Sequence, residues 1–174
     1  MNRRQLLAGF AGAAGTAGGL WIAMNGLSSD GALPVRIETI DAPGSTPGEM
    51  RVPISGEVTV IDLFATWCAP CETQMDRLTA VHREFGQQVR FVSVTNERLG
   101  ETLTRDDLRE WWQQHDGNWS LGLDPESQLM GALNAGGIPF HAVATPDGAI
   151  TWKERGLTSE DTLRTAIQRA IDDE

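Results

Sequence analysis

The sequence predicts an α/β fold with a central mixed β-sheet that is flanked by helices and extended by N-terminal strands. Residues 58–64 and 89–95 are near-continuous apolar runs, as in parallel strands that are buried on both faces. The segment between them, residues 69–85, is long enough for a crossover helix, so the three form a βαβ unit. Residues 140–145 and 149–154 flank a Pro-Asp-Gly turn and predict an antiparallel hairpin.

The N-terminal strands are predicted from two short runs ahead of the βαβ unit. Residues 35–40 and 50–52 are strand-like, and the stretch between them is rich in proline and glycine, as turns are. Together they predict an N-terminal hairpin or extension. A chain of 174 residues is long enough for one domain with its own core, and we expect this domain over residues 31–174.

A helix after the second apolar strand is predicted from its first turn. Thr104 and Asp107 have the spacing of a capping box, in which each side chain bonds to the other residue's backbone N–H, and the helix would end near Gln114. Trp111 and Trp112 are adjacent, so they cannot lie on the same face of this helix. We expect one of them in the core and the other partly exposed, rather than a substrate platform.

The remaining elements complete the sheet and its helical cover. Residues 119–123 predict a short strand, and residues 127–133 predict a short helix. Residues 159–171 predict a C-terminal helix that is capped by Thr158 or Ser159. The resulting order of strand, helix, strand, hairpin and helix fits the predicted mixed sheet flanked by helices.

The two cysteines of the chain stand in the segment Trp67-Cys68-Ala69-Pro70-Cys71, directly after the first apolar strand. Residues three apart on a helix lie about 5 to 6 Å from each other, and a disulfide tolerates Cα separations of about 4.4–6.8 Å. If a helix begins at Cys68, the pair can therefore close and open with little backbone movement. This pattern predicts a redox-active disulfide.

The two thiols are predicted to have different roles. Unpaired N–H groups and the helix dipole stabilise a thiolate at a helix N-terminus, so we expect Cys68 to be the nucleophile. Cys71 lies one turn deeper in the helix and would be the resolving thiol. Pro70 falls in the first turn, where its missing N–H is not needed, and Trp67 would shield one side of the site.

Two other interpretations of the cysteines have weaker support. A zinc site needs four ligands, but the sequence has no second cysteine pair, and His82, His115 and His141 lack the paired spacing of a zinc finger. A purely structural disulfide would close a loop too short to constrain the unfolded chain much. Disulfide exchange is therefore favoured, and it needs no metal and no organic cofactor.

An apolar strand that carries an acid and is followed by Trp-Cys-x-Pro-Cys resembles the thioredoxin superfamily. Within it, the chain is similar to the TlpA/ResA-like extracytoplasmic proteins, because it has an N-terminal export-like segment, an extra strand region over residues 35–53, and the phrase Phe64-Ala65-Thr66-Trp67-Cys68. The similarity extends from about Leu33 to the C-terminus. It implies a thioredoxin-like fold and thiol–disulfide oxidoreductase activity.

The resemblance also assigns roles to positions away from the cysteines. Asp62 matches the buried acid that in thioredoxins helps to move the proton of the resolving cysteine, and a carboxyl group in such a setting can act as a general base. The alternative is an edge-strand acid that faces water. Ile138-Pro139 matches the loop whose proline is cis in thioredoxins, against the alternative of an ordinary trans proline. The expected substrate contacts are Trp67, Ala69, Pro70, Ile138 and Pro139.

Three positions depart from the pattern of the TlpA-like proteins. Gln74 and Asp76 stand where those proteins usually carry Glu and Pro, and His141 lies in the strand after the Ile-Pro loop, where Thr and a longer aliphatic run are usual. We interpret His141 as an ordinary strand histidine, although it is close enough in sequence to the Ile-Pro loop to touch the site. These departures leave the pathway open, cytochrome c maturation included.

The direction of exchange is predicted from the residues between the cysteines. Ala69-Pro70 is nearer to the Gly-Pro of thioredoxin than to the Pro-His of the oxidant DsbA, whose reduction potentials are about −270 and −120 mV. The sequence therefore favours a reductase of protein disulfides. The alternatives are an oxidase or isomerase that donates disulfides, and a non-enzymatic module that delivers copper or haem through Cys68, Cys71 and His141.

The expected partners are a disulfide-containing protein substrate and an electron donor in the membrane. A dithiol that reduces substrates outside the cytoplasm must itself be reduced again, and the TlpA/ResA-like resemblance implies a membrane protein for this step. The net charge of −10 at pH 7 disfavours nucleic acids and anionic surfaces as partners. The excess of acidic residues, with Lys153 as the single lysine, is typical of proteins kept soluble in high salt, and the alternative is an ordinary acidic secreted domain.

The N-terminal segment concerns location rather than fold. Asn2-Arg3-Arg4-Gln5-Leu6-Leu7 resembles a twin-arginine export motif, and residues 5–29 carry no charge and are rich in glycine and alanine. About 20 apolar residues suffice to span a bilayer. We therefore expect residues 1–30 to be a twin-arginine-type signal or a retained membrane tether, with the domain extracytoplasmic in both cases. A disordered start is the alternative.

Overall fold

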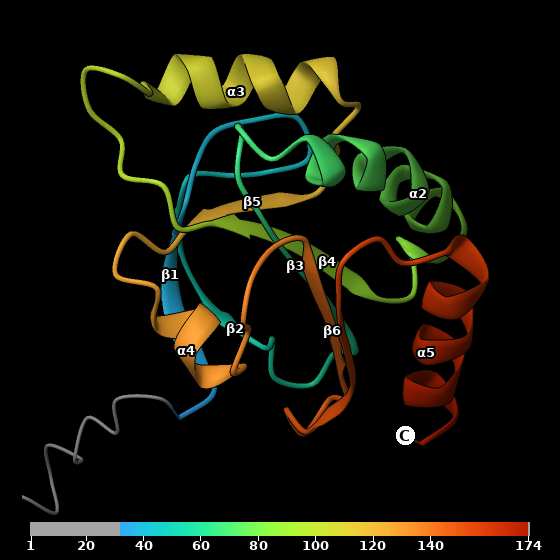
Figure 1. Ribbon diagram of the computed structural model, residues 1–174. Helices are drawn as coiled ribbons and strands as arrows, with labels where there is room; N and C mark the ends of the chain where they lie inside the picture. The colour runs from blue at the N-terminus through green and yellow to red at the C-terminus, as the bar shows by residue number, and fades with distance from the viewer. Residues whose placement is uncertain (1–31, 174) are drawn as a thin grey trace, which may run out of the picture.

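The computed structural model describes residues 32–173, and within them the strands form one seven-stranded sheet (Figure 1). The sheet order is β2-β1-β5-β4-β3-β6-β7. The elements in chain order are β1 (Val35–Thr39), β2 (Gly48–Val52), β3 (Thr59–Phe64), α2 (Ala69–Phe85), β4 (Arg90–Thr95), α3 (Arg105–Gln114), β5 (Ser120–Leu123), α4 (Gln128–Ala132), β6 (Phe140–Ala144), β7 (Ile150–Arg155) and α5 (Glu160–Asp172).

The centre of the sheet is the predicted βαβ unit with the hairpin added beside it. β3 pairs in parallel with β4, to which α2 connects it, and pairs antiparallel with β6 on its other side. All six residues of β3 are buried, because the strand has a neighbour on each side and helices above and below. The mixed sheet and the order of its elements are confirmed, with boundaries within two residues of those expected.

Helices cover both faces of this sheet. Buried side chains of α2, α3 and α5 form one core cluster with one face, and those of α4 form a second cluster with the opposite face. β3 alternates between the two, since Val60 and Phe64 face α2 while Ile61 and Leu63 face α4. Figure 1 shows α3 across the top of the view, α2 below it to the right, and α5 at the lower right.

The N-terminal extension adds two strands to the sheet. β1 pairs antiparallel with β2, and Glu38 and Thr39 of β1 pair with Leu123 and Gly122 of β5. The expected N-terminal hairpin is therefore confirmed, and it lies at the β5 edge of the central strands. This arrangement leaves β3 in the interior of the sheet, between β4 and β6.

The loop between β1 and β2 approaches the backbone ahead of β5 closely at Gly44, whose φ is +74°. A Cβ at this position would lie 2.1 Å from the carbonyl carbon of Asn118, so the two backbone segments would have to separate. We expect Gly44→Ala to lower the free energy of unfolding by about 1–3 kcal/mol more than Gly56→Ala does. Gly56 is the matched control, because it has a similar φ of +82° but open space around its Cβ position. Urea unfolding of both variants measures the difference, and equal losses would contradict the close approach.

α3 has the predicted capping box, and of its two tryptophans one is buried and the other partly exposed, as predicted. The Thr104 side chain accepts from the backbone of Asp107, and the Asp107 carboxylate accepts from the backbone and hydroxyl of Thr104, which lowers the pKa of Asp107. Trp112 is fully buried, while Trp111 is half-buried and stacks on Phe64 with ring centroids 4.8 Å apart. Both tryptophans thus belong to the packing of α3 on the sheet.

The predicted signal or anchor, residues 1–30, lies outside the described residues. No helix within residues 32–173 has both the length and the apolar character that crossing a membrane requires. The twin-arginine and membrane-tether expectations therefore remain predictions from the sequence.

Candidate active site

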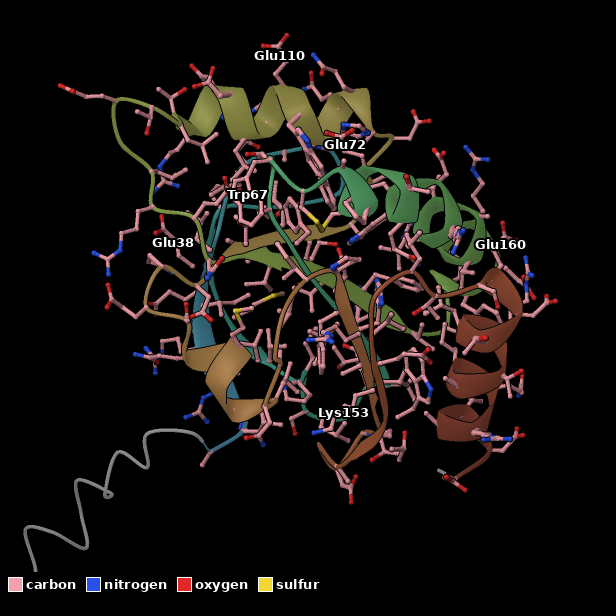
Figure 2. All side chains as sticks on the ribbon, viewed as in Figure 1. Glu38, Trp67, Glu72, Glu110, Lys153 and Glu160 are labelled. Atoms are coloured by element: carbon pink, nitrogen blue, oxygen red, sulfur yellow. A yellow bond between two sulfur atoms is a disulfide. The ribbon has the colours of Figure 1, made fainter. Side chains whose placement is uncertain are left out.

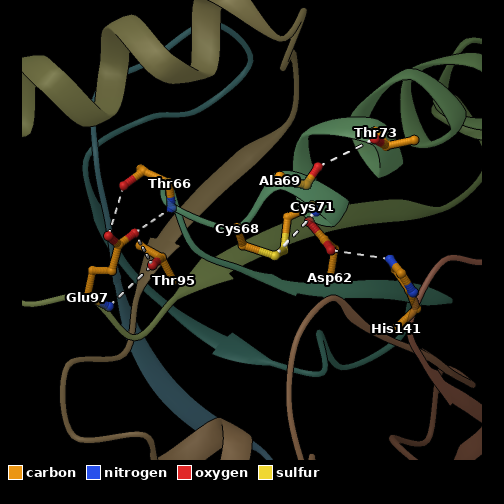
Figure 3. Close-up of a disulfide and its surroundings, with 9 residues drawn as sticks. All are labelled: Asp62, Thr66, Cys68, Ala69, Cys71, Thr73, Thr95, Glu97 and His141. Carbon is orange, nitrogen blue, oxygen red and sulfur yellow. Dashed lines mark hydrogen bonds and ion pairs between the residues drawn. A yellow bond between two sulfur atoms is a disulfide. The ribbon is translucent and has the colours of Figure 1, made fainter.

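The cysteines lie at the junction between β3 and α2 and form a disulfide (Figure 3). Cys68 is the N-cap of α2, and its Cα lies 5.2 Å from that of Cys71, as expected for residues one helical turn apart. The backbone N–H of Cys71 donates to Cys68 Sγ over 3.3 Å. Both cysteines are buried, with 5 % of Cys68 and 2 % of Cys71 exposed. Pro70 lies in the first turn of α2, where sequence analysis placed it.

A glutamate from the end of β4 holds the turn that precedes the cysteines. The backbone N–H and the hydroxyl of Thr66 donate to the two carboxylate oxygens of Glu97 over 2.7 and 2.8 Å. Thr95 also donates its hydroxyl to Glu97, over 3.0 Å. Thr66 comes two residues before Cys68, so this half-buried carboxylate determines the direction in which the chain enters α2. Figure 3 shows these bonds on the β4 side of the disulfide.

Asp62 is buried in the middle of β3, with 3 % of its surface exposed. It alternates with Val60 and Phe64, so its side chain lies on the face that α2 covers. Ser93 of β4 donates its hydroxyl to Asp62 Oδ2 over 2.7 Å, and Trp119 Nε1 donates to Ser93 Oγ over 2.9 Å. The alternative of an edge-strand acid facing water is therefore wrong.

His141 lies directly opposite Asp62 in the pairing of β3 with β6 and is fully buried. Its Nε2 is 3.4 Å from Asp62 Oδ1, and its Nδ1 is 3.3 Å from the hydroxyl of Thr158. The interpretation of His141 as an ordinary strand histidine is therefore wrong, because antiparallel pairing places it against the acid. A buried ring nitrogen without a hydrogen bond costs about 1–3 kcal/mol, which an ordinary core position would avoid.

Gln74 connects the cysteine helix to the loop before α5. This side chain is fully buried, its Nε2 donates to the carbonyl of Thr158 over 3.1 Å, and its Oε1 accepts from the Thr158 N–H over 2.9 Å. An amide can make both bonds, whereas a carboxylate has no proton to donate. The pair of hydrogen bonds to Thr158 therefore gives a structural reason for Gln in place of Glu at this position.

Of the expected substrate contacts, Ala69 and Pro70 lie between the cysteines at the start of α2, and Trp67 directly precedes them. The Ile138–Pro139 peptide bond is cis, as the resemblance implied, and Ile138 packs against the core cluster that contains both cysteines. The Pro139 carbonyl accepts from the N–H of Gly156 over 2.8 Å, which joins this loop to the end of β7. Trp67 is 73 % exposed, and Figure 2 shows it near the start of α2. An exposed indole beside a disulfide can contact a partner without any change in the core.

The family of the chain follows from its sequence match. The family model described as "AhpC/TSA family" matches residues 50–153, a span that runs from β2 through the cysteine helix to β7. This chain belongs to the AhpC/TSA family. Membership confirms the thioredoxin-type resemblance, and the matched span includes both cysteines, Asp62 and the Ile138–Pro139 loop.

Two relatives of this AhpC/TSA-family chain are named for thiol–disulfide chemistry. It is 20 % identical over 116 residues to "Thiol-disulfide oxidoreductase ResA" of Bacillus cereus (strain ZK / E33L), covering 67 % of this chain and 65 % of the relative. It is 21 % identical over 119 residues to "Thiol:disulfide interchange protein CycY" of Rhizobium leguminosarum bv. viciae, covering 68 % and 61 %. The match thus spans less than two thirds of the length of these relatives.

Solved structures show that the fold is thioredoxin-like. StoA from Bacillus subtilis superposes with a TM-score of 0.61 at 18 % identity, over 77 % of this chain and 97 % of that one. DsbF of MTB, in mixed oxidised and reduced forms, superposes with a TM-score of 0.66 at 18 % identity, over 79 % of this chain and 96 % of that one. DsbE from Chlorobium tepidum superposes with a TM-score of 0.62 at 20 % identity, over 82 % of this chain and 98 % of that one. The likeness extends over more than three quarters of this chain in each case.

One hollow of this AhpC/TSA-family chain lies away from the cysteines. A hollow of about 380 Å³ is lined by residues of β7 and α5, such as Trp152 and Arg169, and not by the cysteines. Within residues 32–173, no three His, Cys, Asp or Glu side chains are grouped so as to hold a metal ion. Trp67, Ala69 and Pro70 are exposed around the buried disulfide, so a large partner can contact these residues.

Sequence analysis missed the contacts that support the site. Glu97 follows directly on a parallel strand, at the edge where the turn before Cys68 also lies, and an acid in that place was a usable signal. The contact of His141 with Asp62 had no comparable signal, because it depends on the register between β3 and β6. The bond between Gln74 and Thr158 joins residues 84 apart in the chain and was equally hidden.

Proposed function

We propose that this chain is an extracytoplasmic thiol–disulfide oxidoreductase that reduces disulfides in protein substrates. The observation that carries the proposal is the closed Cys68–Cys71 pair at the N-terminus of α2. The printed names of the relatives, an oxidoreductase and an interchange protein, support the same chemistry. An open site with an exposed tryptophan suits a protein substrate better than a small molecule.

In the first step, the reduced enzyme attacks the substrate. The thiolate of Cys68 attacks one sulfur of the substrate disulfide, which breaks the substrate S–S bond and forms a mixed disulfide. The other substrate sulfur leaves as a thiolate and takes up a proton. Trp67, Ala69 and Pro70 would contact the substrate on one side, and the backbone of Ile138–Pro139 on the other.

In the second step, Cys71 resolves the mixed disulfide. Asp62 accepts the proton of the Cys71 thiol, and the resulting thiolate attacks Cys68 Sγ. The Cys68–Cys71 bond forms as the bond to the substrate breaks, so two electrons have passed to the substrate. No metal or organic cofactor takes part, and an electron donor in the membrane restores the dithiol.

The location follows from the N-terminal segment and the chemistry. A twin-arginine-type signal or membrane tether over residues 1–30 would place the domain outside the cytoplasm. Disulfide-bonded substrates are abundant in that oxidising environment and rare in the cytosol. A reductase is therefore useful there, provided that the membrane donor supplies its electrons.

The reduction potential of the pair tests the direction of exchange. We expect a value near that of thioredoxin, about −270 mV, because Ala-Pro separates the cysteines. The full chain is equilibrated in graded thiol/disulfide buffers and the oxidised fraction is measured, with Cys71→Ser as the control that cannot close the pair. A value near −120 mV would identify a disulfide donor instead. A pair that never cycles would contradict exchange and favour metal or haem delivery, which the metal content of the purified protein would then show.

A further inference from the structure

A row of three polar side chains crosses the core beneath the cysteine helix. Ser93 of β4, Asp62 of β3 and His141 of β6 lie directly opposite one another in three adjacent strands. All three are buried, with exposed fractions of 0, 3 and 0 %. Val60, Phe64 and Val143, which neighbour them on this face, are apolar core residues packed with α2, whereas Thr95 beside Ser93 is polar. The row is therefore a titratable feature in a mostly apolar layer.

The hydrogen bonds of this row leave one gap. Asp62 Oδ2 accepts from Ser93, but Asp62 Oδ1 and His141 Nε2 are 3.4 Å apart, beyond the usual 2.7–3.2 Å of an N–H···O bond. Within residues 32–173, His141 Nε2 is one of three buried side-chain polar atoms without a hydrogen-bond partner. Figure 3 shows Asp62 between the disulfide and His141, with the ring nitrogen directed at the carboxylate. The gap thus lies on the side of the acid away from the cysteines.

The position of His141 is maintained from α2. Its Nδ1 lies 3.3 Å from the Thr158 hydroxyl, and both polar atoms of the Gln74 side chain bond to the Thr158 backbone. Gln74 comes three residues after Cys71 on the same helix. With the ring proton on Nδ1 and donated to Thr158, Nε2 turns a lone pair toward the carboxylate. Two acceptors then face each other, and one proton between them completes the bond.

We propose that His141 is a positioning residue for Asp62, and that the two share the proton that leaves Cys71 during resolution. The inference rests on the proposed function and adds a residue to it. The S–H bond of Cys71 breaks and its proton passes to Asp62, where His141 Nε2 shares it. The sulfur electron pair forms the bond to Cys68 Sγ, and the substrate sulfur leaves with the electrons of the broken bond. The proton returns to Cys71 when the donor restores the dithiol, so no further reactant is needed.

Asp62 and His141 are surrounded by residues of α2, β7 and α5, and few of these residues can exchange a proton with them. From α2 the titratable groups on this side are Cys68, Cys71 and the half-buried His82, whose ring packs on Trp119 and Phe91 and not on the pair. The cation Arg77 donates to the Thr158 carbonyl over 3.0 Å. From β7, Glu154 pairs with His141 but is exposed to solvent. The buried residues of α5 are apolar: Leu163, Ala166, Ile167 and Ala170. A proton shared inside the pair avoids an isolated buried charge, which makes the acid a better acceptor for the thiol proton.

The reaction of the reduced full chain with Ellman's reagent tests this inference. Attack by Cys68 releases the first thionitrobenzoate, and attack by Cys71 on the mixed disulfide releases the second, so the two steps are followed separately by absorbance. We expect His141→Gln to leave the first release unchanged at pH 7 and to slow the second about tenfold. The loss should disappear above pH 9, where a free thiol of pKa about 8.5 ionises without help. In an Asp62→Asn background, His141→Gln should cause no further loss.

Each result of this experiment has a distinct meaning. Equal slowing at pH 7 and above pH 9, or the same additional loss in the Asp62→Asn background, would overturn the inference. If His141→Gln does not fold, Thr158→Val replaces it, since it keeps the histidine but removes the partner of Nδ1, and a smaller loss confined to neutral pH is expected. A wild-type chain that shows no second release would instead contradict the proposed function itself, so the two failures are distinguishable.

Discussion

Cys68→Ser is expected to abolish the reduction of insulin disulfides, with the rate falling to that of the uncatalysed reaction. Cys68 is the N-cap of α2, where the helix N-terminus stabilises a thiolate, and a serine hydroxyl stays protonated where a thiol forms a nucleophilic thiolate. Turbidity from reduced insulin, in the presence of dithiothreitol, measures the loss.

Cys71→Ser is the matched variant, because it removes the other sulfur of the pair with the same chemical change. It should still attack a substrate disulfide but should accumulate the mixed disulfide, which mass spectrometry detects as a covalent adduct on Cys68. An adduct that forms in Cys68→Ser and not in Cys71→Ser would reverse the assigned roles.

Glu97→Ala is expected to slow disulfide exchange by about 10- to 100-fold and to lower the free energy of unfolding by about 2–3 kcal/mol. The substitution leaves the N–H and hydroxyl of Thr66 without their carboxylate, and the turn that aims the chain at Cys68 loses its fixed geometry. Exchange rates with Ellman's reagent and urea unfolding measure the two effects on the same sample.

Glu126→Ala is the control for this variant. It makes the same chemical change at an exposed glutamate, whose ion pair with Arg98 at 2.9 Å is of the surface kind that contributes less than about 1 kcal/mol. Losses of equal size in the two variants, or an unchanged exchange rate in Glu97→Ala, would show that Glu97 does not hold the site.

Much of the fold was predictable because its signals are local. The apolar runs of β3 and β4 specify buried strands, and the Thr104–Asp107 pair specifies the start of α3 through contacts within one turn. The spacing of Cys68 and Cys71 likewise determines their distance once a helix begins there. Family resemblance supplied Asp62 and the Ile138–Pro139 loop, which residue chemistry without that resemblance would not have singled out.

Local sequence was sufficient for the elements of this protein and for its disulfide, since periodicity, caps and helical spacing act over a few residues. Tertiary structure decided what surrounds the disulfide. Glu97 reaches Thr66 because parallel strands bring their ends to one edge, and His141 faces Asp62 because β6 pairs with β3 in one register. A shift of one residue would turn the histidine to the opposite face of the sheet. Such contacts depend on how distant segments align, and short-range patterns do not encode that alignment.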